Sequence, residues 1–235
     1  MNAWIIIGCA IAVAFVFCVL LFIANHSGER FMEKYEKMNN IIAETRLSPK
    51  EFIDFIHKTY LKGNLEIVQI SRIAGDAYSK GKLFLSGDTI YKNTLASFTI
   101  IAHEMGHALQ DHEGRKLKRL NFLRKLGKIL GALMFPSLVA GIILLFFKNL
   151  FVVAISLICF AVFVFLLALI VKIITISIEK DASKKAIIFL KDVLNEKQLK
   201  KCKKFLNSAR LTYWGEFLRI LLIWTGFSRK AKLFN

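Results

Sequence analysis

Three long stretches of this chain contain no charged residue, and they restrict the folds that are open to it. They cover Ala3–Ala24, Ile129–Phe147 and Leu150–Val171, and they are 22, 19 and 22 residues long. A helix rises about 1.5 Å per residue, so roughly 20 residues cross the hydrocarbon core of a bilayer. A chain of 235 residues could not cover three such helices within a soluble domain. The sequence therefore predicts a mainly α-helical integral membrane protein with about three transmembrane helices.

The first stretch predicts a retained anchor rather than a cleaved signal peptide. No Lys or Arg precedes it, and its apolar run is longer than the core of a typical signal peptide. The residues that follow it offer no clear cleavage site of the small-x-small type. The second and third stretches are separated only by Lys148 and Asn149, which predicts a tight antiparallel hairpin.

The segment between the first and second stretches has the pattern of a small α+β domain. Ser48 can cap a helix that starts at Pro49, and Glu51 can complete a capping box. Two short β-like runs follow at 65–70 and 82–86, and then a helix from Leu95 to Gln110. Beyond the third stretch we expect a basic helix over about 182–209. The apolar segment 211–227 either spans the membrane a fourth time or lies in its interface.

The formal net charge of +17 does not indicate a nucleic-acid-binding protein, because no nucleic-acid-binding module is recognisable. The basic residues flank the apolar stretches, which is typical of an orientation signal and of contact with anionic lipid headgroups. Lys and Arg number 18 between the first and second stretches and eleven between the third stretch and Arg210, against Lys148 alone in the hairpin tip. We therefore expect a multi-pass plasma-membrane protein whose two long segments face the cytoplasm. None of the four cysteines belongs to a C-x-x-C pair, so neither a disulfide framework nor a thiolate zinc site is indicated.

The motif His103-Glu104-Met105-Gly106-His107 has the H-E-x-x-H pattern of zinc hydrolases. Residues four apart share one face of a helix, so both imidazoles can reach one zinc ion. Glu104 can hold and deprotonate a water on that ion, because zinc lowers the pKa of bound water to about 7. The neighbouring positions are uncharged, as a buried metal helix requires. We expect one zinc ion per chain, with Glu104 as the catalytic base.

A catalytic zinc usually has three protein ligands, so a third is needed from elsewhere in the chain. The hairpin returns the chain to the membrane side that carries His103 and His107, and there it delivers Glu179 and Asp181. In a helix these two acids point about 200° apart, so only one of them can face the metal. Glu179 is the preferred third ligand. Asp181 is the alternative ligand, or else a hydrogen-bond partner of one of the ligands or a helix cap.

These motifs together resemble the neutral zinc metallopeptidases of the YugP-type membrane family. The resemblance lies in residues 83–86, 102–111, 179–186 and 209–213, and its order and spacing cover nearly the whole chain. It implies a gluzincin-like peptidase with zinc on two histidines and a glutamate. Related membrane gluzincins carry Glu-x-x-x-Asp, where this chain has Ser183 in the final position. The family's Asp-His-Tyr-Asp-Pro turn reads here as 76–80, Asp-Ala-Tyr-Ser-Lys.

A peptidase also needs a donor for the oxyanion of its tetrahedral intermediate. Tyr213 and Arg210 are candidates, because they lie in the last of the matching segments. We accordingly divide the chain into an anchor, a catalytic domain, a transmembrane hairpin, and a third-ligand helix with its C-terminal amphipathic or re-entrant segment. These parts cover residues 1–25, 26–128, 129–171 and 172–235.

The expected function is a membrane-embedded zinc endopeptidase that acts on membrane-associated polypeptide. One alternative is a zinc-stabilised, non-catalytic membrane scaffold or adaptor, although a purely structural site has no need of the general base Glu104. Another is a zinc hydrolase or sensor that acts on something other than peptides. The sequence specifies neither the substrate nor the oligomeric state.

Overall fold

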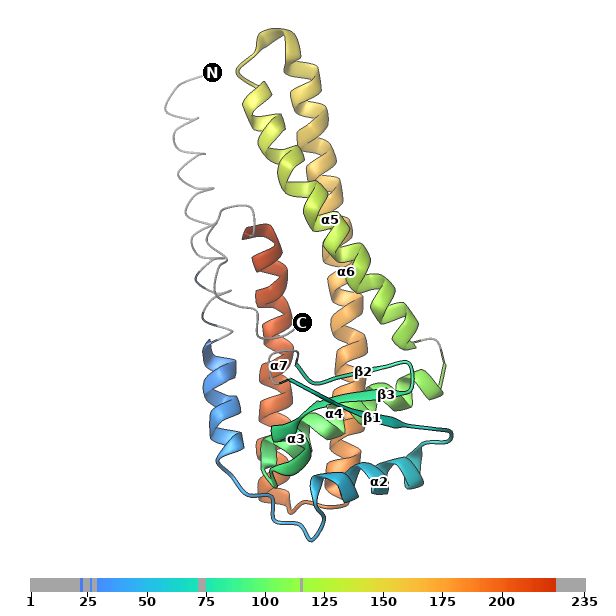
Figure 1. Ribbon diagram of the computed structural model, residues 1–235. Helices are drawn as coiled ribbons and strands as arrows, with labels where there is room; N and C mark the ends of the chain where they lie inside the picture. Colours follow the sequence, from blue (N-terminus) through green and yellow to red (C-terminus); the bar gives the residue numbers. More distant parts are fainter. Residues whose placement is uncertain (1–21, 23–25, 27–28, 72–74, 115, 223–235) are drawn as a thin grey trace.

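Most of the chain is helical in the computed structural model, and one small sheet accompanies the helices (Figure 1). The structure describes residues 22, 26, 29–71, 75–114 and 116–222. The predicted anchor over residues 1–25 therefore lies outside the described residues, Phe22 excepted. The first described helix runs through 29–39. Phe31 on this helix stacks on Phe205, with ring centroids 5.2 Å apart, which joins the helix to the C-terminal part of the fold.

The predicted hairpin is present as two long antiparallel helices, α5 (Lys116–Leu144) and α6 (Phe151–Lys191). A short 3-10 turn, η2 (Lys148–Leu150), joins them. Helix α5 begins well before its apolar stretch and α6 ends well after its own, so the predicted boundaries at 128 and 172 are not helix ends. For α6 the reason is local, because residues 172–191 contain neither Gly nor Pro to stop the helix. Figure 1 shows this hairpin extending well beyond the sheet and the other labelled helices.

The basic helix predicted over 182–209 is in fact two helices. Its first part belongs to α6, and its second part opens α7 (Glu196–Leu222). Asn195 stands before α7 and accepts a hydrogen bond from the Gln198 N–H at 2.9 Å, which is the geometry of a helix cap. The chain turns back at this cap, so α7 packs beside α6. No helix end separates the segment predicted over 211–227 from the basic part of α7.

Two described helices are long and apolar enough to cross a membrane. They cover Leu117–Leu144 and Lys148–Lys191, with mean hydropathies of 1.9 and 3.2. Only 17% of each apolar window is buried within the protein, whereas a core helix of a soluble domain would be mostly buried. Large apolar side chains are exposed along both helices, among them Ile143, Phe146, Val152, Phe163 and Ile170.

The α+β part consists of three helices and a three-stranded sheet. The helices are α2 (Pro49–Tyr60), α3 (Gly87–Tyr91) and α4 (Leu95–His112), and the strands are β1 (Glu66–Ile70), β2 (Ala77–Ser79) and β3 (Lys82–Ser86). The capping box at Ser48 is confirmed, and α4 ends two residues beyond the predicted Gln110.

The sheet has the order β1-β3-β2, and its third strand, β2, is absent from the two strands predicted from the sequence. β1 pairs in parallel with β3, and β2 pairs with β3 in antiparallel fashion. Lys80 and Gly81 both have positive φ, 49° and 78°, which makes the two-residue turn that joins β2 to β3. β2 has only three residues and lies in a segment that reads as loop, so periodicity could not reveal it.

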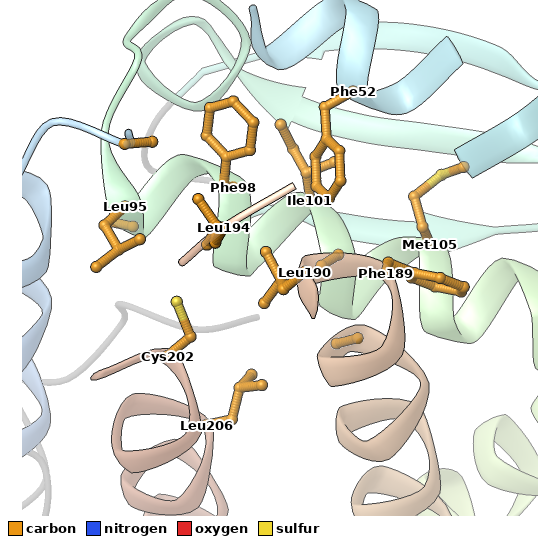
Figure 2. Packing of buried hydrophobic residues seen from close by; sticks show 14 of the residues in the cluster. Phe52, Leu95, Phe98, Ile101, Met105, Phe189, Leu190, Leu194, Cys202 and Leu206 are labelled. Carbon is orange, nitrogen blue, oxygen red and sulfur yellow. The ribbon is translucent and has the colours of Figure 1, made fainter. Parts of the chain in front are cut away.

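One hydrophobic core lies between α2, α4, the end of α6 and the start of α7 (Figure 2). The rings of Phe52 on α2 and Phe98 on α4 are 5.0 Å apart. Phe189 on α6 and Cys202 on α7 close the core from the opposite side, and all four side chains are fully buried. This core holds α4 in a fixed place against α6, and that placement determines the site described below.

One face of α6 carries a small residue every seven positions, and these residues are buried. They are Ala154, Ala161, Ala168, Thr175 and Ala182. Seven residues are close to two helical turns, so the five side chains form a single stripe. On α5, a Cβ added to Gly141 would lie 3.0 Å from the Ala154 carbonyl oxygen and 2.7 Å from a side-chain carbon of Ile158. The two helices therefore approach too closely there for any larger residue.

Replacing Gly141 by Ala is expected to destabilise the hairpin, because the new methyl group meets backbone of α6. An overpacked site of this kind costs about 1–3 kcal/mol, which should appear as a lower melting temperature of the purified protein in detergent. Gly127 on the same helix is the matched control, since its added Cβ would lie 3.6 Å from Val171, an ordinary contact. Gly127→Ala should leave the melting temperature unchanged or raise it, because Ala favours helix by about 0.5–1 kcal/mol. Equal melting temperatures for the two variants would contradict the close approach.

Candidate metal centre

The site begins with a close contact between α4 and α6. A Cβ added to Gly106 would lie 2.6 Å from the carbonyl oxygen of Ala182 and 3.3 Å from its Cα. Real Cβ atoms do not approach other atoms that closely, so the two helix backbones can touch only because residue 106 is glycine and residue 182 is alanine. On α4 this contact lies between the positions of His103 and His107, and on α6 it lies three residues past Glu179.

This contact brings the predicted ligands together. The Nε2 atoms of His103 and His107 lie 3.4 and 3.3 Å from the same carboxylate oxygen of Glu179, Oε2. The two imidazole rings are 4.9 Å apart at an interplanar angle of 79°. One donor atom from each of the three residues lies within 4.8 Å of the other two. The three side chains can therefore hold a single ion among them.

The chemistry of the three donors fits zinc. Two imidazole nitrogens and one carboxylate oxygen form a ligand set that is typical of catalytic zinc, with room for a fourth ligand. Glu179 is only 1% exposed, and its Oε2 has no hydrogen-bond partner among the described residues. An unpaired buried carboxylate oxygen is costly, and a cation between it and the two imidazoles would satisfy it.

The other carboxylate oxygen of Glu179 is bound from α5. Nη2 of Arg124 donates to Glu179 Oε1 at 2.5 Å. In the sequence, Arg124 is one of the 18 Lys and Arg residues between the first and second apolar stretches. No feature of the sequence distinguishes it from its basic neighbours, because the contact depends on how α5 and α6 pack.

Gln110 holds His107 from behind. It lies one turn after His107 on α4, and its Oε1 is 2.9 Å from His107 Nδ1. Its Nε2 donates to the Ile178 carbonyl and to Asp181 Oδ2, both at 2.9 Å, which fixes the orientation of the amide. Oε1 can only accept, so the proton of His107 is on Nδ1 and the lone pair of Nε2 faces Glu179. The i, i+3 spacing of His107 and Gln110 was a sequence signal for this contact.

Asp181, the alternative ligand, lies outside the cluster that His103, His107 and Glu179 form. Its carboxylate faces Gln110, so it supports His107 indirectly. Ser183 lies on the other side, with its Oγ 3.4 Å from His103 Nδ1. Both residues thus occupy positions behind the imidazoles. Glu179 as the third ligand stays a prediction, and this geometry supports it.

Glu104 lies beside the three-residue cluster and is held from the sheet. Its carboxylate Oε2 accepts a hydrogen bond from the backbone N–H of Tyr78 on β2 at 2.9 Å. Burial raises the pKa of Glu104 to about 7, while His103 opposes the shift and Glu179 adds to it. A carboxyl group with a pKa near neutrality can take up and return a proton at physiological pH.

Residues 76–80, which differ from the Asp-His-Tyr-Asp-Pro turn named above, still connect β2 to its neighbours through hydrogen bonds. Asp76 accepts hydrogen bonds from the Ser86 N–H at 2.5 Å and from the Thr89 hydroxyl at 2.8 Å, which ties this segment to the start of α3. The Tyr78 hydroxyl donates to Asp111 on α4 at 3.2 Å. These contacts hold β2 against α4 next to Glu104.

The predicted oxyanion donors Arg210 and Tyr213 both lie on α7. Their side chains are outside the part of the chain that the structure describes, so their role stays a prediction. The structure therefore brings together the four residues at the centre of the prediction, adds Arg124 and Gln110, and leaves these two donors untested.

Comparison with known proteins identifies the chain's relatives at the level of the family. A family model described as putative neutral zinc metallopeptidase matches residues 10–225. No curated protein and no solved structure matches the chain. The matched region includes the described helices and strands, the H-E-x-x-H motif and Glu179. The chain belongs to this family of neutral zinc metallopeptidases.

Proposed function

We propose that this protein is a membrane-embedded zinc endopeptidase that hydrolyses peptide bonds in membrane-associated polypeptides. The observation that carries the proposal is the buried Glu179 Oε2, which has no hydrogen-bond partner among the described residues and faces the Nε2 atoms of His103 and His107. The family relationship supports the same chemistry. One zinc ion per chain would be held by the two histidines and Glu179.

Zinc in this site supplies a Lewis acid that polarises the scissile carbonyl and acidifies water. Glu104 takes the proton from the attacking water and then passes it to the leaving amine, which is the role of a general base followed by a general acid. The Tyr78 N–H orients Glu104 for both transfers, since it fixes one of the two carboxylate oxygens. A variant that lacks the base but keeps the zinc ligands distinguishes the two kinds of zinc site, because only a catalytic site would lose activity.

The sheet offers a place for an extended substrate. β2 lies at the edge of the sheet and is the strand that contacts Glu104. An extended polypeptide can pair with an exposed edge strand through main-chain hydrogen bonds, which binds it without selecting its sequence. A substrate bound along β2 would pass next to the metal site.

The position of the site along α6 favours membrane-proximal substrates. Glu179 lies eight residues past Val171, where the apolar stretch ends, and this corresponds to about 12 Å of helix. We infer that the site faces the cytoplasm of a multi-pass plasma-membrane protein, because the basic flanks of both apolar helices lie on the side of the site. The same flanks would contact anionic lipid headgroups.

Metal content tests the ligand set. Purified protein should contain one zinc ion per chain by elemental analysis. His103→Ala and His107→Ala should lose most of it, and Glu179→Ala should bind it more weakly, because each substitution removes one of three ligands. Asp181→Ala is the comparison variant and should lose less zinc than Glu179→Ala, because Asp181 contacts Gln110 and lies outside the three-residue cluster. Full zinc in Glu179→Ala with loss in Asp181→Ala would reverse the assignment.

Catalysis is tested by Glu104→Gln, which keeps the shape of the side chain and removes the base. The variant should retain zinc and fold but lose peptide hydrolysis by a factor of about 10²–10⁴ or more. Hydrolysis of a fluorogenic peptide library by protein in native membranes is the assay. Activity at the wild-type level would assign the base to another residue, and a wild-type protein that binds zinc without cleaving would favour the scaffold alternative.

Membrane topology is tested by labelling single cysteines in intact cells, in a background that lacks the four native cysteines. A membrane-impermeant reagent should label a cysteine near Asn149 in the hairpin tip and leave one near Lys118 unlabelled. The reason is that the basic segment 115–128 stays on the cytoplasmic side. The opposite pattern would place the metal site outside the cell.

A further inference from the structure

We propose that Arg124 is a positioning residue of the metal centre, through which the hairpin helix α5 controls how Glu179 presents its carboxylate to the metal. This inference rests on the zinc site of the proposed function, but not on peptide hydrolysis. No other part of the zinc cluster comes from α5, since His103 and His107 lie on α4 and Glu179 lies on α6.

The two oxygens of the Glu179 carboxylate have different partners. Oε1 accepts the Arg124 Nη2–H at 2.5 Å, and Oε2 faces the two imidazoles without a hydrogen bond among the described residues. A carboxylate can turn about its last bond and offer one or both oxygens to a metal. A charge-assisted hydrogen bond on Oε1 stops that rotation and leaves Oε2 as the single ligand atom. Binding through one oxygen keeps a further coordination position open.

Arg124 also compensates a charge that is otherwise buried. Glu179 is 1% exposed, whereas the Arg124 side chain is 45% exposed and reaches inward from the surface of α5. A carboxylate that is taken out of water needs a partner, or its charged form is strongly disfavoured. Arg124 therefore holds the Glu179 carboxylate in one orientation before the metal arrives, so less reorganisation accompanies binding.

The packing of α5 fixes the place of Arg124. Leu120 lies one turn before Arg124 and is 0% exposed. Leu123 lies immediately before Arg124 and is 7% exposed. Leu123 belongs to the apolar cluster between α5 and α6, which continues along the hairpin through Leu130 and Val164. The Arg124–Glu179 contact thus connects the apolar part of the hairpin with the ligand.

The experiment measures zinc affinity, not activity. Full-length protein in detergent is freed of metal and titrated with Zn²⁺ in competition with a chromophoric chelator, and Co²⁺ spectra report the coordination. Arg124→Gln is expected to bind zinc about 10- to 100-fold more weakly, as is typical when a group that orients a metal ligand is lost. Arg124→Lys keeps the charge but not the planar fork, so it should also bind more weakly and change the Co²⁺ spectrum.

Arg119→Gln is the matched control, because it removes the same charge from an exposed position on the same helix. Loss of charge alone would make Arg124→Gln bind zinc more tightly, since that variant lacks the cation beside Glu179. Positioning predicts weaker binding for Arg124→Gln and unchanged binding for Arg119→Gln.

Wild-type or tighter zinc binding by Arg124→Gln would overturn the inference, and so would equal weakening in Arg119→Gln. If Arg124→Gln does not fold, wild-type affinity and spectrum in Arg124→Lys would overturn it. A wild-type protein that binds zinc but cleaves no peptide would defeat only the proposed function, whereas a protein that binds no zinc would defeat both.

Discussion

The contact between Gly106 and Ala182 is the constraint on which the site depends. His103 and His107 are brought to the same face by the turn of α4, but the third donor must come from a different helix. Its distance from them is set by how closely the two backbones approach. A residue of ordinary size at position 106 would hold α4 and α6 apart, and Glu179 could no longer face both imidazoles. The large core around Phe98 and Phe189 keeps the helices in this position, so packing and ligand geometry have a common origin.

α6 joins two parts of the molecule that differ in character. Its first half is apolar and pairs with α5, and its second half carries Glu179, Asp181 and Ser183 to the metal helix. One stripe of small residues serves both halves, because Ala154 faces α5 and Ala182 faces α4. The direction in which Glu179 points is therefore fixed by the same face of α6 that packs against α5. No loop interrupts α6 between the two regions, so a rotation of one part of the helix also rotates the other.

Much of the fold and of the metal site could be predicted from the sequence. The remaining features could not, for physical reasons. The pairing of His103 with His107 follows from helical spacing alone, and the return of the hairpin to the same side restricts the third ligand to Glu179, which was preferred, or Asp181. The role of Arg124 depends on side-chain directions across the α5–α6 contact, which no local pattern encodes, whereas the i, i+3 spacing of His107 and Gln110 was a local signal. The strand β2 is too short for periodicity, and the α6–α7 boundary depends on a cap at Asn195 within a segment of uniform composition.

The unbroken course of α6 also limits how the length of this protein can change in evolution. A single residue inserted between Val171 and Glu179 would turn everything beyond it by about 100° and move it by about 1.5 Å, which would carry Glu179 off the face of Ala154 and Ala161. An insertion of seven residues would restore the face but would move Glu179 past Arg124, unless α5 gained the same length. Insertions and deletions in the two helices should therefore occur as matched pairs, while the turn at 145–150 is free to vary.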